Sequence, residues 1–100
     1  MPRIIFQINY DVSPEKREDY LSTIKELQSH IRENSNKNYL IVEDKNKKNN
    51  FTEIYICDNE EEYENLENDP DDRTFELTNK LFSEYVIDQK ARYSTHYEIE

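Results

Sequence analysis

The chain has 100 residues, enough for one domain and too few for a second independent core. It carries 23 acidic against 13 basic residues, a formal net charge of -10, and this acidic excess argues against nucleic acid and anionic membranes as partners. Glycine is absent altogether, which excludes the glycine-rich loops that hold the phosphates of nucleotides.

Hydrophobic residues make up 34% of the chain, and eight of the 100 residues are Tyr. We therefore expect a small core in which aromatic rings take the place of aliphatic side chains. No apolar run approaches the roughly 18 residues of a membrane helix, and no secretory segment precedes the first expected strand. The single Cys57 cannot form an internal disulfide, which fits a reducing compartment. These features predict a cytoplasmic protein.

The first third of the chain reads as a strand followed by a helix. Residues 3–12 alternate between two faces, one of them apolar, which predicts a strand. Ser-Pro-Glu at positions 13–15 is typical of a helix start, because Ser caps free N–H groups and Pro tolerates the first turn. Apolar residues at three- and four-residue steps over 20–31 predict an amphipathic helix that ends near residue 34.

The rest of the chain repeats these patterns. Residues 39–43 and 51–57 have the length and composition of strands, and the Lys/Asn-rich stretch 44–50 predicts a hairpin between them. A helical region opens at 58–60, breaks at Pro70 and restarts at 69–72 with an acidic cap. Apolar residues over 74–86 predict the longer part of this helix, and residues 92–99 alternate as a last strand.

The resulting order, βαββαβ over residues 1–100, predicts a single α+β domain with a ferredoxin-like fold. Its four-stranded antiparallel sheet has two helices on one face. The other face still carries Ile5, Leu40 and Val42, which would form an exposed apolar patch in a monomer. We therefore expect a homodimer that packs sheet face against sheet face.

Three segments carry a resemblance to a known family. They are Ser13-Pro14-Glu15-Lys16, then Glu53-Ile54-Tyr55 followed by Asp58-Asn59-Glu60, and finally His96-Tyr97-Glu98-Ile99. Together they resemble the antibiotic biosynthesis monooxygenase-like domains of the dimeric α+β barrel superfamily, over nearly the whole chain. The resemblance implies a dimer in which two sheets close into one barrel. Members include cofactor-free oxygenases of polycyclic aromatic substrates, haem-degrading enzymes and small proteins without an established activity.

The haem-degrading members supply a specific expectation. The resemblance to them implies an Asn on the first strand, a Trp at the end of the third and an axial His on the second helix. Asn9 and Tyr55 occupy the first two positions, but no His lies between Glu60 and Val86. We therefore expect no haem and no other cofactor.

Five residues are candidates for a site. The candidate catalytic residues are Asn9, Tyr55 and His96, and the candidate ligand-binding residues are Asn9, Tyr55, Phe82 and Tyr85. Asn9 either projects into a pocket between sheet and helices or is an ordinary polar strand residue. Tyr55 and Tyr85 should face each other, and they either line an aromatic pocket or pack in the core. His96 either acts as an acid or base or lies at the surface.

No metal site is expected. His30, His96 and Cys57 are isolated in the sequence and do not have the spacing of a ligand set. The nine carboxylates of residues 58–72 lack the glycine and the spacing of an EF-hand loop, so they are better explained as solvated helix starts.

The leading hypothesis is a dimeric barrel protein that binds a small apolar or aromatic ligand, with cofactor-independent monooxygenase activity left open. The alternative is a non-enzymatic dimerisation or interaction module whose acidic surface recruits a basic partner. Salt distinguishes the two hypotheses. A basic partner held by the acidic surface should be retained at low salt and lost at high salt, because attraction between exposed charges is screened within about 10 Å at 0.1 M salt.

Overall fold

The computed structural model describes residues 2–34, 38–68 and 71–99. Its elements, in chain order, are β1 (Ile4–Asp11), a 3-10 turn (Pro14–Lys16), α1 (Arg17–Asn34), β2 (Asn38–Glu43), β3 (Asn50–Cys57), α2 (Glu60–Asn68), α3 (Asp72–Lys80), a π-helical turn (Leu81–Tyr85), a second 3-10 turn (Ile87–Gln89) and β4 (Arg92–Tyr97). The predicted strands and helices are confirmed, with ends that differ by one or a few residues.

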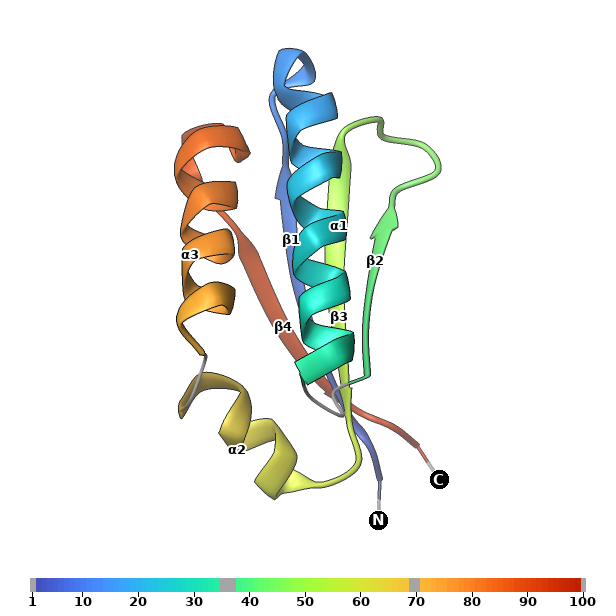
Figure 1. The fold of residues 1–100 in the computed structure, drawn as a ribbon. Coiled ribbons are helices and arrows are strands. Elements are labelled where there is room, and N and C mark those ends of the chain that lie inside the picture. Colours follow the sequence, from blue (N-terminus) through green and yellow to red (C-terminus); the bar gives the residue numbers. More distant parts are fainter. Residues whose placement is uncertain (1, 35–37, 69–70, 100) are drawn as a thin grey trace.

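All four strands form one antiparallel sheet in the order β2-β3-β1-β4. Helices α1 and α3 pack side by side on one face of this sheet, and α2 lies at the end of the molecule where α3 begins (Figure 1). The ferredoxin-like α+β fold is therefore confirmed. Within the described ranges, no helix is long and apolar enough to cross a membrane.

The core lies between the sheet and these two helices. Alternate residues of a strand share a face, so Ile4, Phe6, Ile8 and Tyr10 of β1 all point toward the helices. Tyr10 is completely buried and packs edge to face against Tyr20 of α1, with ring centroids 5.9 Å apart. Aromatic rings thus fill space that aliphatic side chains fill in most domains.

The helix starts agree only in part with the expectation. Asp71 caps α3 as predicted, since its carboxylate accepts the backbone N–H of Thr74 at 2.8 Å. The predicted side-chain cap by Ser13 is wrong, because the chain enters α1 through a 3-10 turn in which the Ser13 carbonyl accepts the N–H of Lys16. The predicted break at Pro70 lies outside the described residues.

The end of the second helical region also differs from the expectation. The pattern predicts one continuous helix to Val86, but the last turn, Leu81–Tyr85, widens into a π-helix. The backbone N–H of Val86 donates a hydrogen bond to the carbonyl of Leu81, five residues earlier, at 3.1 Å. Val86 then forms an isolated β-bridge with Val12, which ties this end of the helix to the chain just after β1.

Among the described residues, three adopt left-handed backbone angles, and in a glycine-free chain none of them is glycine. They are Asn49 with φ 66°, Asp88 with φ 55° and Gln89 with φ 55°. Asn and Asp tolerate this region because their short side chains form local hydrogen bonds, whereas Gln does not share this advantage. Gln89 is therefore the most strained of the three.

We expect Gln89→Gly to raise the free energy of unfolding by roughly 0.5 kcal/mol, since glycine adopts positive φ without a steric penalty. Lys90→Gly is the matched control. Lys90 has φ -105°, an angle that glycine does not relieve, and this change should lower stability. Urea unfolding measures both variants, and equal effects of the two changes would contradict strain at Gln89.

Candidate functional site

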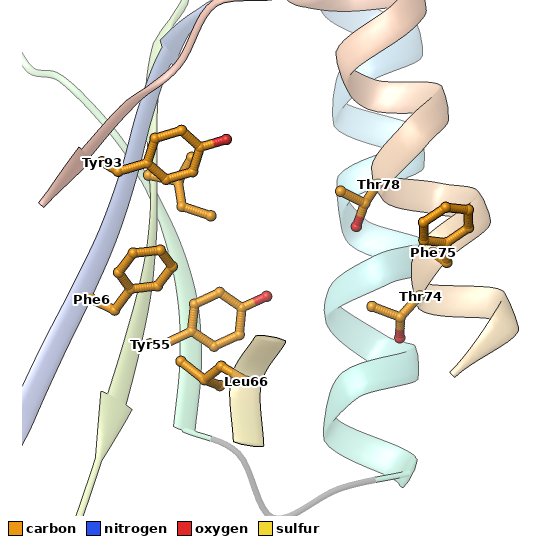
Figure 2. Close-up of a pocket in the computed structure, with 8 residues that line it drawn as sticks. Phe6, Tyr55, Leu66, Thr74, Phe75, Thr78 and Tyr93 are labelled. Carbon is orange, nitrogen blue, oxygen red and sulfur yellow. The ribbon is translucent and has the colours of Figure 1, made fainter. Parts of the chain in front are cut away.

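A pocket of about 240 Å³ lies between the sheet and the helices α2 and α3. Strands β1, β3 and β4 provide its floor, α3 lies opposite them, and Leu66 of α2 lies beside Tyr55 at one end (Figure 2). Its lining residues are Phe6, Ile8, Tyr55, Leu66, Thr74, Phe75, Thr78 and Tyr93. Of the lining residues in the described part of the chain, none is charged.

Strand register explains the aromatic floor. Phe6 of β1 lies directly opposite Tyr55 of β3, with ring centroids 6.2 Å apart. On its other side Phe6 stacks on Tyr93 of β4, also at 6.2 Å and with ring planes inclined by only 17°. Three rings from three neighbouring strands therefore form one continuous surface.

The polar groups of the pocket are hydroxyls. The hydroxyls of Tyr55 and Tyr93 both point toward α3 (Figure 2). Thr74 and Thr78 lie one turn apart on α3, and this spacing puts both of them on the helix face that lines the pocket. The site can therefore surround an apolar body and donate or accept a few hydrogen bonds.

Aromatic side chains at the pocket are left exposed. Phe75 on α3 is 58% exposed, and Tyr93 on β4 is 64% exposed. Exposed large apolar groups that gather around a concave surface are typical of binding sites.

A buried carboxyl lies in the same sheet layer as the floor. Glu53 of β3 is opposite Ile8 and only 3% exposed. The hydroxyl of Tyr39 donates to its Oε1 at 2.6 Å, and that of Tyr10 donates to its Oε2 at 2.8 Å. The Tyr10 hydroxyl also lies 2.8 Å from that of Tyr20. One carboxyl thus links three buried phenols.

Burial controls the titration of this group. Desolvation raises the pKa of Glu53, and the two phenol hydrogen bonds oppose this rise without cancelling it. Burial and the negative charge of Glu53 in turn raise the pKa of Tyr10, Tyr39 and Tyr55. The phenol of Tyr55 at the pocket is therefore a neutral hydrogen-bonding group at physiological pH.

Only Tyr55 of the predicted ligand-binding residues lines the pocket. Phe82 instead packs its ring edge against Tyr10, with centroids 5.4 Å apart. Tyr85 is buried, with its hydroxyl 3.4 Å from that of Thr23 on α1. The expectation that Tyr55 and Tyr85 face each other across one pocket is not met, since the two phenols have different neighbours.

Of the two alternatives for Asn9, the strand register supports the ordinary polar strand residue and not the pocket residue. Tyr10 points toward the helices, so its neighbour Asn9 points to the opposite, uncovered face of the sheet. There its amide nitrogen donates to Asn50 at 2.8 Å, and its oxygen accepts from Nε of Arg92 at 2.9 Å. His96 lies opposite Ile5 and is exposed on the same uncovered face.

Several site residues were missed by the sequence analysis although a signal was present. Phe6 and Tyr93 share the helix-facing register with Tyr55, and Thr74 and Thr78 have the spacing of one helix face. Glu53 lies in the Glu53-Ile54-Tyr55 segment that carries the resemblance, but its burial was not foreseen, because a carboxylate in a strand is ordinarily solvated. Among the residues that the structure describes, no group of three His, Cys, Asp or Glu side chains is placed to hold a metal ion.

Solved structures with this fold are known. A conserved protein from Methanosarcina mazei Go1 superposes with a TM-score of 0.81 at 17% identity, over 99% of this chain and 95% of that chain. A proposed antibiotic biosynthesis monooxygenase from Nitrosomonas europaea gives 0.79 at 5% identity, over 97% and 90%. A further antibiotic biosynthesis monooxygenase gives 0.76 at 15% identity, over the full length of both chains.

The chain therefore has the fold of the antibiotic biosynthesis monooxygenase-like proteins, as the resemblance predicts. No family model matches the sequence, and no curated protein does. At these identities the likeness shows the fold, and the chemistry must be argued from the residues of this chain.

The buried carboxyl generates a pH prediction. A Glu in the unfolded chain titrates near 4.5, and folding raises this pKa, so above 4.5 the unfolded state loses the proton before the folded state does. The free energy of unfolding should therefore fall as pH rises from 4.5 through the folded pKa, and Glu53→Gln should abolish this loss. Glu43, whose pKa Arg17 lowers to about 2, stabilises the folded state above pH 4.5, and this stabilisation is lost only as the pH falls below 4.5, outside the range tested. Denaturant unfolding at several pH values gives both curves, and parallel curves would contradict the prediction.

Proposed function

We propose that this chain forms a cytoplasmic homodimer that binds a small apolar or aromatic ligand in the pocket between its sheet and α2–α3. The observation that carries the proposal is the floor of three adjacent rings, Phe6, Tyr55 and Tyr93, in a concave site of about 240 Å³. Pockets for drug-sized ligands span about 300–1,000 Å³, so this one suits a ligand of one or two rings.

The polar groups favour a ligand that carries a hydroxyl or carbonyl oxygen. The Tyr55 and Tyr93 hydroxyls point into the space that the ligand would occupy (Figure 2). A phenol that packs its ring on this floor can exchange hydrogen bonds with them while its ring stacks. The names of the structurally similar monooxygenases support an extension of the proposal, cofactor-independent oxygenation of the bound ligand.

The ligand proposal is tested with 4-tert-butylphenol. We expect saturable binding, followed by NMR shifts, that Thr78→Phe abolishes because the larger side chain fills the pocket. Asn79→Phe is the matched control, since the same change one residue away lies at an exposed position and should leave binding intact. No binding to the wild type, or equal loss in both variants, would refute the pocket as the site.

Oxygen uptake tests the extension. With a monocyclic quinol as substrate, uptake by the wild type should exceed the rates of the Thr78→Phe variant and of the buffer. Equal rates in all three would leave a binding protein and remove the oxygenase activity.

The uncovered sheet face supports the dimer. Register places Ile5, Leu40, Ile54 and Ile56 next to one another on this face, with Val42 at its edge. The four are only half-buried and Val42 is exposed, so a partner is needed to remove this apolar surface from water. A second copy presents the same surface and completes the core symmetrically.

We expect light scattering to give a mass near twice 12.2 kDa. Ile54→Lys should give a monomer, because it places a charge in the middle of the apolar surface. Ser29→Lys, the same new charge at an exposed position of α1, should leave the dimer intact. A wild-type monomer at micromolar concentration would rule out this assembly.

A further inference from the structure

The net charge of the protein is concentrated in one segment. Residues 58–76 hold ten of the 23 carboxylates and one basic residue, Arg73, which leaves this segment at -9 of the total of -10. The other 81 residues are thus nearly neutral, at -1. Such an asymmetry creates a strong local field instead of a diffuse one.

Helix α2 and the first turn of α3, both in this segment, contribute side chains to the pocket. They are Leu66 of α2 and Thr74 and Phe75 of α3. The single cation of the segment is already engaged, since Arg73 forms ion pairs with Glu26 and Glu76. Outside the segment, His30 of α1 lies 2.9 Å from Asp71 and Arg3 interacts with Asp58, but the segment still carries a formal excess of nine negative charges.

Several of these carboxylates are held in place by hydrogen bonds. The Tyr97 hydroxyl of β4 donates to Glu60 at 2.9 Å, and the backbone N–H of Asp58 donates to Glu62 at 2.7 Å. Tyr63 also packs its ring against Phe6 of the pocket floor, at 6.0 Å. Because the Tyr97–Glu60 and Tyr63–Phe6 contacts join α2 to the sheet, its charges stay close to the pocket.

The interior of the pocket suits the same charge. The faces of Phe6, Tyr55, Tyr93 and Phe75 carry the negative part of the ring quadrupole, which attracts cations. Among the described lining residues there is no Lys, Arg or His to repel a positive ligand. An anion would meet repulsion from the acidic segment and would find no positive partner inside.

We propose that the ligand of this pocket is an organic cation, an apolar or aromatic body that carries a quaternary or protonated amine. This inference rests on the proposed function, since it specifies the charge of the ligand in the same pocket. Aromatic rings bind the cationic group, and the carboxylates of α2 and of residues 71–76 provide the long-range attraction.

Three phenols of nearly equal size test the charge. They are 4-(trimethylammonio)phenol, which is a cation, 4-tert-butylphenol, which is its neutral counterpart, and 4-hydroxybenzenesulfonate, which is an anion. At about 0.02 M salt we expect the cation to bind roughly five- to tenfold more tightly than the neutral phenol, and the anion more weakly than both. The advantage of the cation should shrink at about 0.5 M salt.

Charge reversal locates the attraction. The double variant Glu61→Lys/Glu64→Lys changes two exposed residues of α2 and should remove most of the preference for the cation. Glu15→Lys/Glu18→Lys makes the same change in net charge at the start of α1, at the other end of the molecule, and should preserve the preference (Figure 1). Unchanged binding of 4-tert-butylphenol in both variants verifies that the pocket is intact.

A negative result for the charge of the ligand can be distinguished from a negative result for the pocket itself. Equal affinity for the cation and the neutral phenol overturns the charge proposal and leaves the apolar ligand site standing. Binding of none of the three phenols refutes the proposed function itself. A preference that both double variants reduce equally would show an effect of total charge and would overturn the role assigned to α2.

Discussion

A buried tyrosine needs a partner for its hydroxyl, and for Tyr10 and Tyr39 in this core that partner is the carboxyl of Glu53. Its two oxygens accept from Tyr10 and Tyr39, and Tyr10 extends the chain of bonds to Tyr20. The rings then supply the apolar surface that a chain poor in aliphatic residues lacks. Removing the carboxyl would leave buried phenols without acceptors, at a cost of about 1–3 kcal/mol for each unpaired group. The packing of α1 on the sheet depends on this one polar group.

The two faces of the sheet serve different purposes. The helix face holds the core and the pocket, and the polar groups described within them are phenols, Thr hydroxyls and the carboxyl of Glu53. The other face combines an apolar surface around Ile54 with a polar cluster in which Asn9 bonds to both Asn50 and Arg92. That cluster uses the hydrogen-bonding capacity of Asn9 within the sheet, which explains a polar amide in the middle of a strand without assigning it chemistry.

Much of the fold could be predicted because its signals are local. Alternation over 3–12 and the three- and four-residue steps over 20–31 each depend on neighbours in the sequence, and the order of elements then determines the sheet. The site was predicted less well, because it depends on which strands become neighbours. The strand order brings Tyr93 next to Phe6 although 87 positions separate them in the sequence. No local pattern in the sequence indicates that these two rings are close in space. Asn9 is a different case, since alternation alone already separates it from Tyr10.

The π-helical turn at the end of α3 makes the length of this segment critical. A π turn amounts to one residue inserted into an α-helix, and here it lets the chain reach the β-bridge between Val86 and Val12. If one residue of Leu81–Tyr85 were lost, an ordinary α-helix would form and every later side chain would rotate by about 100°. Val86 would then turn away from Val12, and Tyr85 from Thr23. Insertions and deletions should therefore be excluded from this turn more strictly than from the exposed loop over residues 44–48.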